Sequence, residues 1–471
     1  MVPHRELWIG GEWHSTTKAT PVMNPSTGEV LADVASCSAA EMLDAVAAAS
    51  HALPAWGRTS ARERAEVLRK GYELMMDRAD DIATVMCLEM GKTPAEARAE
   101  VAYAAEFFRW LSELAAHEGG EFRTSPSGRI LTTKRPVGVC LLVTPWNFPA
   151  AMATRKIGPA LAAGCTVILK PAAETPLTAL LLADLLHQAG VPRGVVNVVP
   201  TDDPGTVVAA ALSDPRVRKL SFTGSTSVGR LLLKQAAEHV TRTSMELGGN
   251  APFLVLADAD VDDAIEGALL AKMRNGGQAC TAANRFLVNR SLADEFTDKL
   301  RTRLSALRIG AADQSDTELG PMVSDRAVTS IKRMVSGAES HGASAERMDS
   351  GPDVGYFHPA TALTHVAPDS PILQQEIFAP AAPIVVVDDD EHAVALANDT
   401  DAGLAAYVYG SLPTALGVAE RLEVGMVGIN RGLVSDPAAP FGGVKHSGLG
   451  REGGHEGIAE YQEISYVSAT W

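Results

Sequence analysis

Residues 137–170 read VGVCLLVTPWNFPAAMATRKIGPALAAGCTVILK, and this stretch decides the fold class. Val137 to Thr144 is an apolar run of strand length, and Thr166 to Lys170 is another. The residues between them include a helical segment, Pro159 to Ala163. A strand, a helix and a second strand in this order predict two parallel neighbours in a sheet that helices cover.

The alternation of strands and helices continues along the chain. We expect further strands at Gly194 to Val199 and Lys219 to Phe222, and a fifth at Phe253 to Leu256. Helices are expected between them, at Pro176 to Ala189 and Gly229 to Ala237. The sequence therefore predicts an α/β fold with a mostly parallel sheet covered on both faces, which binds its ligand beyond the carboxyl ends of the strands.

The segments on either side of this block have other patterns. Ser38 to Ala116 has helical periodicity, and Gly91 to Pro94 separates two of its helices. The C-terminal run Ile464 to Ala469 is expected to pair with Arg129 to Lys134, within one chain or across a subunit boundary. A second α/β block runs from about Asp258 to Asn430, with strands expected at Phe286 to Val288, Ala360 to Leu363, Ile384 to Val387 and Ala406 to Tyr409.

The composition limits the classes of function. The chain has 471 residues, 46% of them hydrophobic, and a formal net charge of −16, which argues against nucleic acid as a partner. No apolar run resembles a signal peptide or is long enough to span a membrane. Five scattered cysteines without a CxxC pair favour a reducing compartment over a disulfide framework or a metal site. We expect a cytoplasmic protein.

Two residues carry the chemistry that we infer from the sequence. Cys280 follows Gly276, Gly277 and Ala279, which allow close approach of a ligand, and the backbone after it can run into a helix that lowers the thiol pKa. Glu246 stands beside a glycine pair. A thiol that attacks a carbonyl carbon and a carboxylate that activates water are the two groups that aldehyde oxidation needs. Taken singly, a cysteine inside a cell is more often an inert buried thiol.

Further candidates stand near strand ends. Asn147 leaves the first strand in a proline-bounded turn, where its amide can stabilise an oxyanion or only hold its own turn. Lys170 ends the next strand, where a cation can contact a nucleotide or simply face solvent. Small residues around Gly224 and Ser225 lead into a helix whose N-terminus can bind a pyrophosphate.

Over almost its full length, the chain resembles the aldehyde dehydrogenase superfamily. The matching motifs, in order, are Trp146 to Pro149, Lys170-Pro171, Phe222 to Ser225, Glu246 to Gly249, Gly277 to Cys280, Glu376 to Phe378 and Pro440 to Gly443. The resemblance implies a Rossmann-type cofactor domain (residues 1–117 and 137–248) and a catalytic α/β domain (residues 249–445). It also implies a small β oligomerisation element (residues 118–136 and 458–471) in a homodimer or homotetramer.

The resemblance also implies roles for individual residues. Cys280 is expected to be the nucleophile, Glu246 the general base and Asn147 the oxyanion donor. The residues expected to contact NADP or NAD are Trp146, Lys170, Ala173, Gly224, Ser225, Gly229, Leu247, Glu376 and Phe378. Ala173 stands where relatives restricted to NAD tend to carry a glutamate, so we expect use of NADP or of both cofactors.

Within the superfamily, the chain looks most similar to the succinate-semialdehyde dehydrogenases. Arg155 and Arg274 match two arginines that bind the substrate carboxylate in those enzymes. Those enzymes also use a serine from the loop that spans Leu433 to Asp436 here, and Ser435 is the nearest candidate. Ala282 replaces a second cysteine that forms a redox switch in some relatives, and Asp436 stands where it would repel a substrate carboxylate. The alternatives are another aldehyde (glutarate semialdehyde, glycolaldehyde or lactaldehyde), a CoA-acylating reaction, and an inactive structural homologue.

Overall fold

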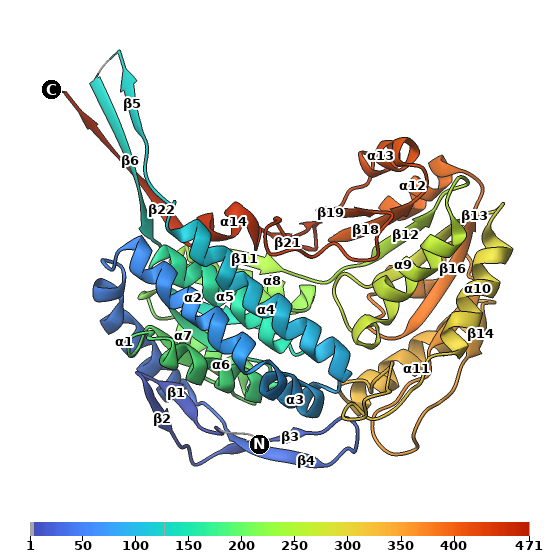
Figure 1. Ribbon diagram of the computed structural model, residues 1–471, viewed down its shortest axis with the longest axis horizontal. Helices are drawn as coiled ribbons and strands as arrows, with labels where there is room; N and C mark the ends of the chain where they lie inside the picture. Colours follow the sequence, from blue (N-terminus) through green and yellow to red (C-terminus); the bar gives the residue numbers. More distant parts are fainter. Residues whose placement is uncertain (1–3, 127, 471) are drawn as a thin grey trace.

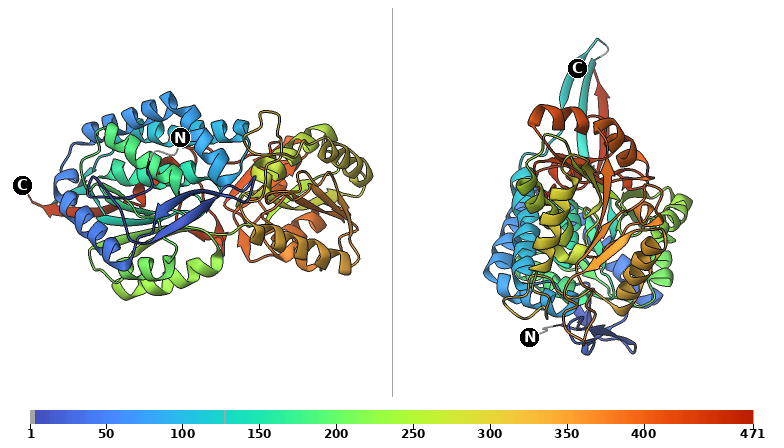
Figure 2. Two further views of the ribbon diagram at one scale, coloured as in Figure 1. Left: turned by 90° about the horizontal axis from the view of Figure 1, so that it is seen from below. Right: turned by 90° about the vertical axis from the view of Figure 1, so that its right-hand side faces the viewer.

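The computed structural model describes residues 4–126 and 128–470. Two large sheets, each with helices on both faces, lie side by side and make up the body of the molecule (Figure 1). A third, three-stranded sheet projects away from this body (Figure 1 and the right-hand view of Figure 2). Among the described helices, none combines the length and the apolarity that crossing a membrane requires.

The first large sheet has the strand order of a doubly wound fold. Its five central strands are parallel, and the order in space reverses between β7 and β10, which creates a crevice at their carboxyl ends. Across the sheet, the strands are β2 (Glu12–His14), β1 (Leu7–Ile9), β9 (Val196–Val198), β8 (Thr166–Lys170), β7 (Val139–Val143), β10 (Val217–Thr223), β11 (Arg242–Glu246) and β21 (Gly448–Leu449).

Helices bury both faces of this sheet, as the continuous apolar runs predict. Cys140 and Leu142 of β7 point into one core, while Val139, Leu141 and Val143 point into the other. The helices of the first core are α2 (Ala61–Asp77), α3 (Ala79–Met90), α4 (Pro94–Ala115), α5 (Pro149–Ala163) and α6 (Pro176–Gln188). Those of the second core are α1 (Ala39–Trp56), α7 (Pro204–Leu212) and α8 (Thr226–Ala236), followed by the 3-10 turn η1 (Ala237–His239).

The second large sheet is also mostly parallel. In spatial order, its strands are β14 (Ser344–Arg347), β15 (Thr361–Thr364), β16 (Ala381–Val387), β13 (Ala283–Asn289), β12 (Ala251–Val255), β18 (Ala405–Tyr409) and β19 (Met426–Ile429). The helices α9 (Val261–Met273) and α10 (Ala293–Ser305) cover one face, and α11 (Asp325–Ser340), α12 (Asp390–Asn398) and α13 (Leu412–Ala419) the other. The 3-10 turns η2 (Arg274–Gly277) and η3 (Pro371–Gln374) lie in its loops. All four strands expected in this block are confirmed.

The projecting sheet is antiparallel and consists of β22 (Gln462–Ala469), β6 (Gly128–Pro136) and β5 (Phe122–Ser125). Its β22 pairs with β6 within one chain, which confirms the expected partner and decides between the two arrangements that the sequence left open. The short helix α14 (Gly454–Ala459) precedes β22. The remaining small pairs are β3 (Ala19–Met23) with β4 (Val30–Ala35) and β17 (Ala402–Gly403) with β20 (Val444–Lys445).

One strand of the first block was predicted wrongly. The run at Phe253 belongs to β12 of the second sheet, and the fifth parallel strand of the first sheet is β11, Arg242–Glu246. The sequence of β11, RTSME, has a single strongly apolar residue, so it lacks the run that identified the other strands. The strand is nevertheless the one that carries Glu246 at its carboxyl end.

Candidate active site

A cleft of about 220 Å³ opens at the carboxyl ends of the first sheet. Because β7, β10 and β11 are parallel neighbours, the residues that follow each of them meet at one edge. The loop before β13 of the second sheet closes the opposite side with Cys280. The lining residues are Pro145, Trp146, Asn147, Phe148, Met152, Thr223, Gly224, Ser225, Glu246, Leu247, Gly248, Cys280, Glu376 and Phe378. The expected nucleophile, base and oxyanion donor therefore share one cleft.

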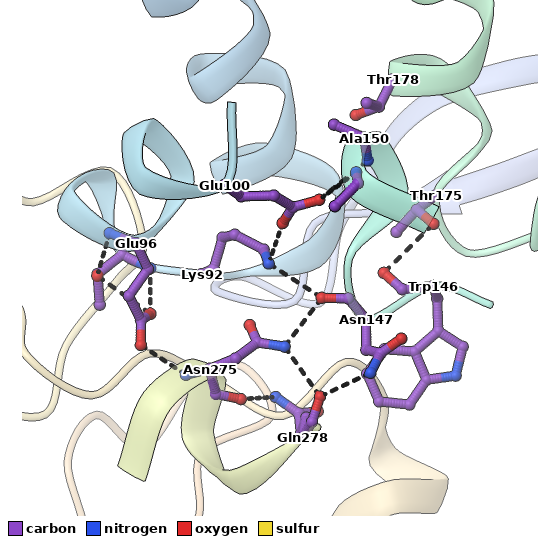
Figure 3. A network of polar contacts seen from close by, with 12 residues as sticks. Lys92, Glu96, Glu100, Trp146, Asn147, Ala150, Thr175, Thr178, Asn275 and Gln278 are labelled. Atoms are coloured by element: carbon purple, nitrogen blue, oxygen red, sulfur yellow. Dashed lines mark hydrogen bonds and ion pairs between the residues drawn. The ribbon is translucent and has the colours of Figure 1, made fainter. Parts of the chain in front are cut away.

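Asn147 lies in the turn between β7 and α5, and polar contacts hold it on both sides. Its side-chain Nδ2 donates to the carbonyl oxygen of Gln278 at 3.0 Å, two residues before Cys280. Its own carbonyl oxygen accepts from Lys92 Nζ and from Asn275 Nδ2, each at 2.9 Å (Figure 3). The residue is 4% exposed. An amide N–H in this position can donate to an oxyanion that forms beside Cys280.

Three consecutive left-handed residues shape the loop that carries Cys280. Asn275, Gly276 and Gly277 have φ values of 55°, 61° and 73°. At Gly277 a Cβ atom would lie 2.3 Å from the carbonyl oxygen of Ala379, so this position requires glycine. This tight turn brings Gln278 to Cys280 against the turn that holds Asn147.

The expectation that a helix follows Cys280 and lowers its pKa is wrong. The next element is the buried strand β13, so the backbone that follows Cys280 does not enter a helix. Burial instead raises the pKa of the Cys280 thiol to about 12, and the positive charges of Arg155 and Arg274 offset part of this effect. Cys280 is therefore a thiol at neutral pH in this state, and it must lose its proton before it can attack a carbonyl.

Glu246 stands at the carboxyl end of β11 and is 2% exposed. Neither of its carboxylate oxygens has a hydrogen-bond partner among the described residues. Burial, followed by the negative charge of Glu452, raises the pKa of Glu246 well above its ordinary value. A buried carboxyl group with free oxygens is available to take a proton from a water molecule once it has ionised.

A buried ion-pair cluster lies next to Glu246, and the sequence analysis missed its acidic member. Glu452 Oε2 lies 2.6 Å from Arg155 Nε, and Glu452 also pairs with Lys156. The Arg155 guanidinium stacks 4.0 Å from the centre of the Phe441 ring. The cluster therefore combines two basic side chains with one carboxylate.

Most of the expected cofactor contacts line the cleft. Ser225 caps α8 by accepting from the N–H of Val228 at 3.4 Å, so Gly224 and Ser225 stand at a helix N-terminus. Glu376 accepts from the N–H of Gly249 at 3.1 Å, and burial raises its pKa to about 7. The rings of Trp146 and Phe378 meet edge to face at 5.3 Å.

Three expected cofactor residues do not line this cleft. Lys170 is the last residue of β8 and is 6% exposed. Burial lowers its pKa to about 8, and the negative charge of Glu174 offsets part of this effect. Ala173 lies three residues after it, in the loop before α6. Gly229 is inside α8, where a Cβ atom would lie 2.5 Å from Leu247, so it allows Leu247 to pack rather than facing a ligand.

The residues expected to bind a carboxylate gather around a tyrosine that the sequence analysis did not identify. Burial raises the pKa of Tyr103, on α4, while the charges of Arg155 and Arg274 and contact with Ser435 act against that rise. Arg274 stacks 5.0 Å from the Phe148 ring. The side chain of Asp436 is exposed and accepts from the N–H of Ala438 at 2.9 Å, so it closes its own turn.

The comparisons with known proteins agree with one another. The model of the Aldehyde dehydrogenase family matches residues 13–467. A succinate-semialdehyde dehydrogenase of Paenarthrobacter nicotinovorans is 51% identical over 93% of this chain and 98% of its own. A glutarate-semialdehyde dehydrogenase of Pseudomonas aeruginosa is 46% identical, covering 98% and 97% of the two chains. The succinate-semialdehyde dehydrogenase (NADP(+)) GabD of Escherichia coli K12 is also 46% identical, with the same coverage.

Solved structures are similar over the whole chain as well. The crystal structure of a succinate-semialdehyde dehydrogenase from Burkholderia pseudomallei superposes with a TM-score of 0.98 at 45% identity, covering 100% of this chain and 98% of that one. A betaine aldehyde dehydrogenase from Staphylococcus aureus in complex with NAD+ has a TM-score of 0.95 at 32% identity, covering 98% and 94%. The overall fold of these structures is thus the fold described above.

Proposed function

Because this chain belongs to the aldehyde dehydrogenase family, we propose that it oxidises succinate semialdehyde to succinate with NADP or NAD. The observation that carries the proposal is the shared cleft of Cys280, Glu246 and Asn147, with Arg155 and Arg274 acting on Cys280 from nearby. The first three residues support oxidation of an aldehyde. The two arginines support a substrate with a negatively charged end.

The charges around the cleft support an anionic substrate. Arg155, Lys156 and Arg274 are basic, and Glu452 is the carboxylate paired with the first two. Burial and the negative charge of Glu452 raise the pKa of Glu246 well above its ordinary value, and Glu246 adds no negative charge to the cleft until it ionises. A carboxylate on the substrate tail would balance the positive excess, and charge-assisted hydrogen bonds to arginine are among the stronger ones in proteins. Tyr103 and Ser435 offer additional hydroxyl groups for the same tail.

The cleft also fits a nicotinamide dinucleotide. Gly224 and Ser225 stand at the N-terminus of α8, which suits a pyrophosphate, and the carboxylate of Glu376 suits ribose hydroxyls. A Cβ atom on Gly248 would lie 2.7 Å from Glu376 Oε2, so this glycine leaves Glu376 room to turn toward a ribose. When bound, NAD(P)+ supplies the acceptor for the hydride that leaves the aldehyde carbon.

In the mechanism that we infer, each residue has one task. Cys280 loses its proton to solvent, its thiolate attacks the aldehyde carbon, and the adduct becomes a thioester once its hydride has passed to the acceptor that NAD(P)+ would supply. Asn147 Nδ2 donates a hydrogen bond to the oxyanion of the adduct. Glu246 then takes a proton from water, which attacks the thioester, releases the acid and returns Cys280 as a thiolate.

The residues near the expected adenosine end of the cofactor favour NADP or use of both cofactors. Lys170 carries a positive charge near the expected adenosine end, and Ala173 places no negative charge beside a 2′-phosphate. Glu174 is exposed. Its carboxylate is therefore free to stay in solvent when a 2′-phosphate binds.

Steady-state kinetics over a panel of aldehydes, with NAD and NADP in parallel, tests the proposal directly. The panel contains succinate semialdehyde, glutarate semialdehyde, glycolaldehyde, lactaldehyde and butanal. We expect the highest kcat/KM with succinate semialdehyde. A higher value with a neutral aldehyde would contradict the role of the arginines, and a value that rises only when CoA is added would favour the acylating reaction.

Glutarate semialdehyde is the second candidate. A relative that is 46% identical over 98% of this chain acts, by its name, on that aldehyde. It carries the same two functional groups one methylene further apart, and one methylene changes binding by only about 1–3 kcal/mol. Comparing kcat/KM for succinate semialdehyde and glutarate semialdehyde is therefore the most informative measurement of the panel.

We further propose a homodimer or homotetramer in the cytoplasm. The outer strand β22 supports assembly, because its Ile464, Tyr466 and Val467 are 73%, 69% and 54% exposed. Five free cysteines support a reducing compartment. The proposed domains are residues 1–117 with 137–248 for the cofactor, residues 249–445 for catalysis, and residues 118–136 with 458–471 for assembly.

A further inference from the structure

A buried lysine and a buried glutamate outside the cleft hold the turn that carries Asn147. Lys92 and Glu100 are 2% and 3% exposed and form an ion pair with each other. Lys92 Nζ also donates to the carbonyl oxygen of Asn147 at 2.9 Å (Figure 3). The same nitrogen lies 4.2 Å from the centre of the Phe148 ring. The lysine therefore contacts two successive residues of this turn.

Glu100 holds the other end of the same turn. Its Oε1 accepts from the N–H groups of Ala150 and Ala151 at 2.9 and 3.1 Å, at the beginning of α5. The N-cap residue of α5, Phe148, has no side chain that can accept these hydrogens. The Glu100 carboxylate of α4 therefore caps α5, and its negative charge interacts favourably with the positive end of the helix dipole.

The same part of α4 holds the loop of Cys280. Thr93 and Glu96 form a capping box at the start of α4, and Glu96 Oε1 accepts from the N–H of Asn275 at 2.5 Å. Asn275 Nδ2 then donates to the carbonyl oxygens of Asn147 and Gln278 at 2.9 and 3.0 Å. Residues 92 to 100 therefore touch both the turn of the expected oxyanion donor and the loop of the expected nucleophile.

This arrangement leaves the amide of Asn147 little freedom. Two donors fix its carbonyl oxygen, and Glu100 fixes the peptide groups that follow, so only the side-chain torsions of Asn147 remain. One N–H of Nδ2 goes to Gln278, and an amide has two such donors, which leaves the other for an oxyanion. Errors of about 1 Å in the placement of a catalytic group can cost a factor of about 100 in rate.

We propose that Lys92 and Glu100 are positioning residues that aim Asn147 at the oxyanion formed on Cys280. A buried ion pair is a poor source of stability, because the cost of desolvating two charges offsets most of their attraction. Its contacts with Asn147 and with the start of α5 give it a positional task instead. The inference rests on the proposed aldehyde oxidation, but on no particular aldehyde.

A double-mutant cycle tests this proposal. The paired substitution Lys92→Met with Glu100→Gln removes both charges and keeps an amide oxygen that can accept from α5. It is made in the unmodified protein and in Asn147→Ala, and the burst of reduced cofactor is followed by stopped flow with the best aldehyde. The exposed pair of Arg98 with Asp80 supplies the control, Arg98→Met, which we expect to leave the burst unchanged.

We expect the pair of substitutions to lower the burst rate constant at least tenfold with an unchanged burst amplitude. In the Asn147→Ala background, the same pair should lower it less than twofold, because the group that it positions is gone. An equal drop in both backgrounds, or a lower amplitude with an unchanged rate constant, would show a merely structural role and overturn the proposal. If the unmodified protein reduces neither NAD nor NADP with any aldehyde of the panel, the proposed function fails as well.

Glu100→Gln alone serves if the paired variant does not fold. It keeps an acceptor for the N–H groups of α5 and removes only the partner charge of Lys92. Glu100→Gln is then made in the unmodified protein and in Asn147→Ala. We expect the burst rate constant to fall at least threefold in the unmodified protein and to stay unchanged in Asn147→Ala. A burst rate constant within 1.5-fold of the unmodified protein would overturn the proposal.

Discussion

Asn147 and Gln278 are joined by a hydrogen bond of 3.0 Å from the side-chain Nδ2 of the first to the carbonyl oxygen of the second. The bond links the turn after β7 of the first sheet to the loop before β13 of the second. It fixes the distance between the expected oxyanion donor and Cys280, two residues beyond Gln278. The proposed catalysis therefore depends on how the two sheets are joined.

Replacing Glu246 with Gln should separate the two halves of the reaction. The variant keeps Cys280 and Asn147, so we expect a full first-turnover burst of reduced cofactor. Steady-state turnover should fall about 100-fold or more, because the amide cannot take a proton from water. Stopped-flow and steady-state assays of one preparation measure both quantities. The exposed Glu238→Gln is the matched control, and undiminished turnover of Glu246→Gln would refute the assigned base.

The alkylation of Cys280 should depend steeply on pH. With a thiol pKa of about 12, the reactive thiolate fraction rises about tenfold for each unit between pH 7 and pH 9. We expect the rate of inactivation by iodoacetamide, without cofactor, to follow this slope. Arg274→Gln should slow it at each pH, because the Arg274 charge lowers the pKa of Cys280. A plateau between pH 7 and pH 9 would contradict the raised pKa.

Apolar runs were sufficient to predict most of the fold. The strands at Val139, Thr166 and Ile384 are buried on both faces, so their sequences are continuously apolar. The strand β11 was missed because it lies between β10 and the short β21 and contains Arg242, Thr243 and Ser244. Local pattern does not reveal a strand whose place in the sheet is decided by neighbours far along the chain.

Most residues of the candidate site were also predicted from the sequence. The meeting of Asn147, Glu246 and Cys280 in one cleft was expected from the family motifs, because β11, the strand that ends in Glu246, was not recognised in the sequence. Their chemical roles stay predictions. Glu452 and Tyr103 were not found, because each acts through partners more than 50 residues away. Lys92 stood in a segment that looked only like a helix break, and its contact with Asn147 exists only in the folded chain.

Replacing Ala173 with Glu should shift the cofactor preference toward NAD. A carboxylate near the 2′-phosphate of NADP would repel it, and we expect kcat/KM for NADP to fall about tenfold to 100-fold, roughly 1–3 kcal/mol. The value for NAD should change less than threefold. Ala173→Gln adds similar volume without charge and is the control. Equal losses with both cofactors would show that residue 173 does not face the 2′ position.

Charges on β22 should disrupt the proposed assembly. Ile464 and Tyr466 are alternate residues of one strand, so they lie on the same face, and both are largely exposed. We expect Ile464→Lys with Tyr466→Lys to convert the oligomer to monomer in light scattering at micromolar concentration. Glu463→Lys adds a charge on the opposite face and should leave the mass unchanged. An unchanged mass for the double variant would exclude this face from the interface.

Replacing Arg274 with Leu should abolish the preference for a charged aldehyde. Arg274 is the better choice than Arg155, because Arg155 is paired with Glu452 and its loss would also leave a buried carboxylate less compensated. Butanal has the chain length of succinate semialdehyde without its carboxylate. We expect the ratio of kcat/KM for succinate semialdehyde over butanal to fall at least tenfold, since a charge-assisted hydrogen bond contributes about 1.5–3 kcal/mol.

The ratio is the proper measurement because Arg274 also lowers the pKa of Cys280. Any loss of thiolate scales the rates with both aldehydes alike and cancels, whereas loss of the carboxylate contact affects one of them. Arg290→Leu, at a side chain that is 68% exposed, controls for the change in total charge. If the ratio for Arg274→Leu stays at its original value, Arg274 does not bind the substrate tail, and a neutral aldehyde becomes the better substrate hypothesis.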